Sequence, residues 1–124
     1  MTTIIDHRHL ARLLATGRVG LGVLLLVRPR SARSWMGDVV DDSGARVAVR
    51  ALAMRDLVIG AGVLRALDRG EPLRPWLGYS AAADLTDSVA TLGAMRRLPR
   101  GALGALALAA GSAAVSLVGM SEVD

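Results

Sequence analysis

Four apolar segments, each about as long as a membrane-crossing helix, are the feature that most constrains the fold of this chain. They cover approximately residues 10–27, 45–66, 76–95 and 101–120. Residues that cap or end helices flank them: Asp6, Pro29, Asp41, Asp42, Pro75 and Pro99. About 20 helical residues span the hydrocarbon core of a bilayer, and no segment shows the alternation of a β-strand. The sequence therefore predicts an all-α fold, a four-helix transmembrane bundle, with residues 1–124 as a single domain.

A soluble four-helix bundle is the structural alternative, because charged residues interrupt three of the four segments. Each ionised side chain costs at least ~2.5 kcal/mol at mid-bilayer on insertion scales. A soluble bundle, however, needs a polar face on every helix. Segment 101–120 has no charged residue, and residues 19–27 read VGLGVLLLV. With hydrophobic residues at 52%, the chain is expected to be a multi-pass protein of the cell membrane, the bacterial inner membrane.

The arginines at the joints predict an orientation. Two joints that would lie on the same side carry Arg28, Arg30, Arg33, Arg96, Arg97 and Arg100. The opposite side carries Arg8, Arg65, Arg69 and Arg74. By the positive-inside rule, the first group is expected in the cytoplasm and both termini outside. Trp35 and Trp76 fall at segment ends, where amphipathic rings favour the membrane interface.

Five charged residues fall within about one turn of the midpoints of their segments: Arg18, Arg55, Asp56, Asp84 and Asp87. On a helical wheel, the two later aspartates share a polar stripe with Ser80, Ser88 and Thr91, while the arginines border small residues. Charges so deep in a membrane usually face the bundle interior and pair with one another. The sequence predicts a buried layer in which Arg18 and Arg55 bond to Asp84 and Asp87, with Asp56 completing it. For Arg50, about six residues from the centre of its segment, two positions are open: it reaches into the layer, or its side chain extends outward.

This layer suggests a function without fixing one. In a dry pocket, Asp84, Asp87 and Asp56 are candidate acid–base groups, and Arg18, Arg50, Arg55 and Tyr79 are candidate substrate-binding groups. The first hypothesis is a membrane protein that binds a lipophilic small molecule, and in its stronger form transforms it by isomerisation, cyclisation or hydration. The alternative is a non-catalytic accessory or assembly subunit of a membrane complex whose layer only fixes helix register. Whether the chain is an enzyme stays open.

Several other classes of function lack support in the sequence. The chain has no cysteine, which removes disulfides and thiolate chemistry. The DLTD stretch at 84–87 and the pair His7 and His9 are too small to predict a metal site, so neither a metal nor another cofactor is expected. All 15 basic residues are arginines spread over every segment, which does not indicate nucleic-acid binding. The expected partners are membrane lipid, a lipophilic small molecule, and a second copy or another membrane protein.

Several short stretches resemble a known family when taken together. They are Arg28-Pro29, Trp35-Met36-Gly37, RALAMRDLVIGAGVLRAL at 50–67 and AADLTDSVATL at 82–92. They are similar to a family of small, uncharacterised four-helix membrane proteins of actinobacteria, DoxX-like in outline. The most specific part is matched by Arg50, Arg55, Asp56, Gly60 and Gly62, within a resemblance that covers about residues 10–120. It implies an integral membrane four-helix protein and no particular reaction.

Overall fold

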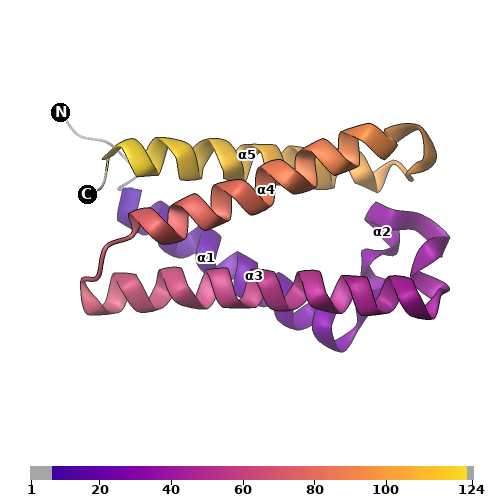
Figure 1. Cartoon of the computed structure of the whole chain (residues 1–124), viewed down its shortest axis with the longest axis horizontal. Helices are drawn as coiled ribbons and strands as arrows, with labels where there is room; N and C mark the ends of the chain where they lie inside the picture. Colours follow the sequence, from indigo (N-terminus) through magenta and orange to yellow (C-terminus); the bar gives the residue numbers. More distant parts are fainter. Residues whose placement is uncertain (1–6, 123–124) are drawn as a thin grey trace.

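The computed structural model describes residues 7–122, which form helices and no strand. Its four long helices are α1 (His7–Val27), α3 (Ser43–Arg69), α4 (Arg74–Ala94) and α5 (Gly101–Glu122) (Figure 1). The predicted all-α class is thus confirmed, and each apolar segment lies in one long helix, except that Met95 at the end of the third belongs to a following short turn. The second long helix, α3, extends beyond the expected segment 45–66 at both ends. Asp42 caps it by accepting a hydrogen bond from the amide of Ala45 at 3.2 Å, as the sequence predicts, whereas the expected cap Asp6 lies outside the described residues.

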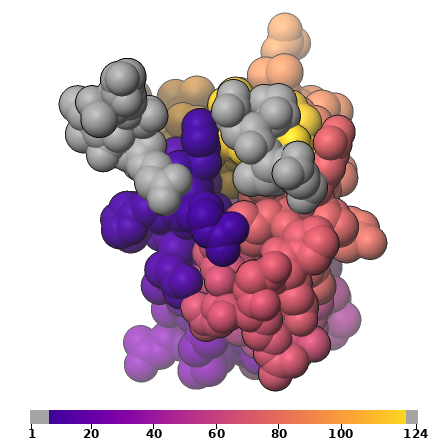
Figure 2. Space-filling view, turned by 90° about the vertical axis from the view of Figure 1, so that its left-hand side faces the viewer, coloured from indigo at the N-terminus to yellow at the C-terminus, as the bar shows by residue number. Residues whose placement is uncertain are grey.

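The joint between the first two long helices is itself helical. It consists of η1 (Pro29–Ala32), α2 (Arg33–Met36) and η2 (Gly37–Asp41), and a second short turn, η3 (Met95–Arg97), follows α4. Arg33 holds the joint together by donating to Asp38 at 2.7 Å and to Asp41 at 2.6 Å. The hydrogen bond from Arg33 lowers the pKa of the exposed Asp41 carboxyl. We call the end of the bundle that carries this joint the loop end. The opposite end, with His7 and Gly70, is called the terminal end, and it faces the viewer in Figure 2.

The long helices are arranged as two pairs, α1 with α3 and α4 with α5, and contacts between the pairs are much sparser (Figure 1). Glycines allow the first pair to approach closely. A Cβ added at Gly22 would lie 2.8 Å from the carbonyl oxygen of Ala53, and one added at Gly60 would lie 2.8 Å from that of Ala15. Small residues on facing helices therefore bring the two backbones together.

Two separate apolar clusters hold the helices at their two ends. The cluster toward the terminal end includes Ala11 and Ala15 of α1 with Val63 and Leu67 of α3. The cluster toward the loop end is built from Leu25, Ala32, Val40, Val49 and Ala53. In the sequence, Arg18 of α1 and Arg55 and Asp56 of α3 lie between the residues of these two clusters. The apolar core is therefore interrupted midway along both helices.

Two of the long helices are long and apolar enough to cross a membrane: His7–Val27, and Gly101–Met120 within α5. Their mean hydropathies are 1.8 and 1.9, and only 22% and 11% of the residues in their most apolar windows are buried inside the protein. Both helices therefore turn most of their apolar surface outward.

The close approach of α1 and α3 generates a first prediction. Gly60→Ala forces a methyl group against the backbone of α1, and is expected to lower the free energy of unfolding by about 1–3 kcal/mol. Gly20→Ala is the matched control, because a Cβ at Gly20 meets nothing within 4 Å. It should leave stability unchanged or raise it, since alanine is the better helix former. Thermal or denaturant unfolding of the purified protein measures both, and equal stability of the two variants would contradict the packing described.

Candidate functional site

An alternating chain of charged side chains crosses the middle of the molecule in the order Asp84, Arg18, Asp56, Arg55, Asp87. Arg18 comes from α1, Arg55 and Asp56 from α3, and the remaining two aspartates from α4. We call these five residues the Arg/Asp layer. The sequence prediction that the two arginines bond to Asp84 and Asp87, with Asp56 completing the network, is confirmed by these contacts.

Arg18 is the centre of the Arg/Asp layer. Its Nη1 donates to Oδ1 of Asp56 at 2.8 Å, and its Nη2 lies 2.6 Å from both carboxylate oxygens of Asp84. Nη2 also lies 3.0 Å from the hydroxyl of Ser80 and 3.5 Å from that of Ser112. Only 11% of the Arg18 side chain is exposed, and 6% of each of its two carboxylate partners. One guanidinium group thus contacts all three of the other long helices.

Arg55 forms the second half of the layer and is more accessible. Its two terminal nitrogens donate to the two oxygens of Asp87 at 3.1 and 2.7 Å, a fork-to-fork pairing that fixes orientation. Nη2 also reaches Oδ1 of Asp56 at 3.3 Å. Its buried Nε has no hydrogen-bond partner within the described residues. Oδ1 of Asp56 therefore accepts a hydrogen bond from each of the two guanidinium groups.

Two of the predicted substrate-binding residues lie outside the layer. Arg50 is exposed, and its Nε donates to the carbonyl oxygen of Leu26 at 3.2 Å. Tyr79 is 60% exposed and packs edge-to-face on Trp76. Of the two positions open to Arg50, the structure shows the outward one, because its place on α3 directs the side chain to the end of α1. Neither side chain lines the groove described next.

A largely apolar groove of about 650 Å³ runs from the Arg/Asp layer toward the loop end. Arg18, Asp56, Asp84 and Ser112 lie at its polar end, and Trp35 and Ser34 of α2 lie in its wall at the other. Leucines and small residues of α1 and α5 form much of the remaining wall, among them Leu13, Gly17, Leu21, Gly104, Ala105, Leu108 and Ala109. Leu13, Leu21 and Leu108 are among the exposed side chains, so the groove is open along α1 and α5.

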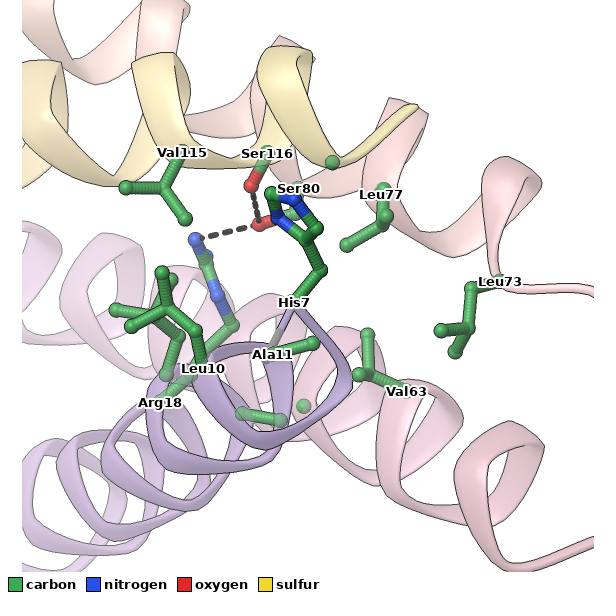
Figure 3. Close-up of a pocket in the computed structure, with 14 residues that line it drawn as sticks. His7, Leu10, Ala11, Arg18, Val63, Leu73, Leu77, Ser80, Val115 and Ser116 are labelled. Atoms are coloured by element: carbon green, nitrogen blue, oxygen red, sulfur yellow. Dashed lines mark hydrogen bonds between the residues drawn. The ribbon is translucent and has the colours of Figure 1, made fainter. Parts of the chain in front are cut away.

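A second, much smaller cavity lies on the terminal side of the layer (Figure 3). Its volume of about 30 Å³ has room for about two water molecules. Arg18 and Ser80 lie at its inner end, where Ser116 contacts the hydroxyl of Ser80 at 3.3 Å, and His7 lies among its lining residues. Arg18 and Leu14 line both cavities, which therefore adjoin at these two side chains.

The groove depends on contacts that the sequence did not reveal. The indole nitrogen of Trp35 donates to Thr91 of α4 at 3.0 Å, which ties α2 across to the second helix pair. Gly101, the first residue of α5, packs directly on the backbone of Ser34. The available signals were a tryptophan whose N–H needs a partner and a glycine two residues after Pro99. Together these contacts close the loop end of the groove.

Among the described residues, no group of three histidine, aspartate or glutamate side chains is arranged to hold a metal ion. Chemically, the groove offers hydrogen-bond donors from Arg18 and Ser112 and acceptors from Asp56 and Asp84 beside an apolar wall. This is the usual composition of a site for a small molecule, in which few polar groups orient a mostly apolar ligand.

These features define a helical protein with a charged layer and an adjoining groove, two of whose helices are able to cross a membrane. Comparisons with protein-family models, with characterised proteins and with solved structures gave no match for this chain. The resemblance to small actinobacterial membrane proteins therefore stays a prediction, and the site must be interpreted from its own residues.

The burial of the layer generates a second prediction. Arg18→Gln leaves Asp84 without its arginine and Asp56 with only the longer contact to Arg55, and is expected to lower the free energy of unfolding by about 3–5 kcal/mol. Arg12→Gln is the control on the same helix, since the Arg12–Asp68 pair has side chains 47% and 64% exposed and should contribute about 1 kcal/mol or less. Denaturant unfolding measures both. A cost no larger at Arg18 than at Arg12 would refute a stabilising role for the layer.

Proposed function

We propose that this is an integral membrane protein of the bacterial inner membrane in which all four long helices cross the bilayer. Each of them exposes large apolar side chains, for example Leu24 of α1, Val58 of α3, Val89 of α4 and Leu108 of α5. Exposed apolar surface spread over every long helix is unusual for a soluble monomer and ordinary for a lipid-facing one. The support for this proposal is strongest for α1 and α5, the two apolar helices.

The charges of α3 and α4 are compatible with spanning. Between Arg50 and Arg65 the only charged residues of α3 are Arg55 and Asp56, which belong to the layer. Those two flanking arginines are about 22 Å apart along the helix, so their long side chains can extend to the two membrane surfaces. In α4 the only charged residues after Arg74 are the layer's two aspartates. The layer would then lie near mid-bilayer, with the arginine-rich loop end in the cytoplasm and both termini outside.

Within the membrane, we propose that the groove binds a lipophilic small molecule whose polar group contacts the Arg/Asp layer. The observation that carries this proposal is an apolar groove of about 650 Å³ with its one charged end at Arg18, Asp56 and Asp84. Small-molecule sites commonly measure ~300–1,000 Å³. The open side along α1 and α5 offers entry from lipid. A chemical transformation by Asp56 or Asp84 is the stronger form of the hypothesis. Asp87 does not line the groove, which weakens its case as an acid or base.

The alternative, a structural layer in an accessory subunit, also has a specific observation in its favour. The two helix pairs contact each other sparsely, and ion pairs from Arg18 and Arg55 to α4 join them. A layer that only fixed register would need no ligand. Under this alternative, Asp84→Asn and Asp87→Asn would weaken folding or assembly and change nothing else.

Topology provides a third prediction. Because the chain has no cysteine, single-cysteine variants report position cleanly. In intact spheroplasts, a membrane-impermeant maleimide should label Asp68→Cys at the terminal end, and should label Val39→Cys at the loop end only after permeabilisation. The reverse pattern would overturn the orientation. Release of the protein from membranes by alkaline carbonate would overturn membrane spanning itself.

Ligand binding provides a fourth prediction. In detergent or nanodiscs, diphenylhexatriene probes should quench the emission of Trp35 by energy transfer in a Trp76→Phe background. Ala109→Phe, which fills the groove, is expected to weaken this saturable quenching at least tenfold. Ala110→Phe is the matched control, since Ala110 is exposed and does not line the groove. If no probe of any charge shows quenching that is sensitive to Ala109→Phe, the groove is not a ligand site and the structural alternative stands.

A further inference from the structure

The Arg/Asp layer contains one more carboxylate than guanidinium group. Arg18 is the ionisable residue that α1 contributes, Arg55 and Asp56 come from α3, and Asp84 and Asp87 from α4. Along the same level α5 contributes the hydroxyls of Ser112 and Ser116. With every group ionised, the layer has a formal charge of −1. An unbalanced charge that is largely removed from water is strongly unfavourable, so the layer favours a positive partner.

The excess negative charge faces the groove. The ionisable residues that line the groove are Arg18, Asp56 and Asp84, so the wall by itself has a formal charge of −1. Arg55 and Asp87 lie outside the wall and neutralise each other through their two-pronged contact. A ligand in the groove therefore meets two carboxylates and one guanidinium group.

Asp56 supplies an acceptor that the protein leaves unused. The residue is 4% exposed and lies in the groove wall. Within the described residues, both hydrogen bonds that it accepts, from Arg18 and from Arg55, end on Oδ1. Oδ2 accepts neither of them, and it is not fully buried, since the fully buried side-chain atom without a partner in the described part of the chain is Arg55 Nε. In the groove wall, Oδ2 is therefore a negatively charged acceptor available to the positive charge of a ligand.

We propose that the groove takes a lipophilic organic cation, an amine or quaternary ammonium with an apolar body, whose charge lies beside Asp56 Oδ2. This inference rests on the proposed function that the groove binds a lipophile, and it names the class of that ligand. The apolar body lies along the leucines of α1 and α5 toward Trp35. A fatty acid or phosphate head is disfavoured at this position, because it would add a like charge beside two carboxylates.

A matched set of probes tests the charge preference. Diphenylhexatriene, its trimethylammonium derivative and its propionic acid derivative share one fluorophore and differ in charge. In the Trp76→Phe background, the cationic probe should quench Trp35 with an affinity at least tenfold higher than that of the neutral probe, and the anionic probe should bind most weakly. Detergent or nanodiscs of zwitterionic lipid are used, so that the bilayer itself does not select by charge.

Variants then test whether Asp56 causes the preference for the cationic probe. Asp56→Asn should lower the affinity for the cationic probe at least tenfold and leave that for the neutral probe unchanged. Asp68→Asn, an exposed carboxylate on the same helix outside the groove, is the control and should change neither. Should Asp56→Asn fail to fold, Ser112→Lys adds a positive charge to the wall without removing any of the five charged residues. It should abolish the cationic preference in the same way.

The outcomes separate this inference from the proposed function. Equal affinities for the three probes, all blocked by Ala109→Phe, would overturn the cation preference while groove binding stands. Tightest binding of the anionic probe would overturn it as well. If none of the probes responds to Ala109→Phe, both the cation preference and the groove-binding function are wrong.

Discussion

The contact on which the rest of the structure depends is that of one guanidinium group, Arg18, with carboxylates from two other helices. The helix pairs α1–α3 and α4–α5 are each well packed internally but touch each other sparsely. Arg18 bonds to Asp56 within its own pair and to Asp84 of the other pair. Charge-assisted hydrogen bonds are directional as well as strong. They therefore fix the height and rotation of the pairs, where apolar contacts alone would permit sliding.

The distribution of charge among the helices follows from this arrangement. Within the Arg/Asp layer, α3 and α4 hold four of the five ionised groups, and in an apolar medium these must find partners inside the bundle. The two helices without an acidic residue in their described membrane-length stretch, α1 and α5, are the ones that pass as membrane spans by composition. These two helices also form most of the groove wall. The surface that a lipophile would enter is thus formed mainly by the two most apolar helices.

The sequence was sufficient to predict the helices and most of the charged layer, because both depend on periodicity and depth. Arg18, Asp84 and Asp87 fell on inward faces by the wheel alone, and they pair as predicted. Arg50 extends away from the layer because a long arginine can reach an unpaired carbonyl group at a helix end, here that of Leu26 in α1. Tyr79 does not line the groove although it precedes buried Ser80, because one residue along a helix rotates the side chain by 100°. The groove was beyond prediction, since its width depends on how far α5 stands from α1.

The excess of carboxylates over guanidinium groups distinguishes a layer that only holds the helices in register from a layer that also binds a ligand. Arg18 with Asp84 and Arg55 with Asp87 already join the two helix pairs, and these four residues are electrically neutral together. Asp56 adds no link to α4 or α5. It follows Arg55 on the same helix and turns an otherwise balanced network negative, at a buried position in the wall of the groove. A purely structural layer gains little from such a residue, because burying an additional charge lowers stability. A layer that binds a cation, in contrast, needs the additional carboxylate of Asp56.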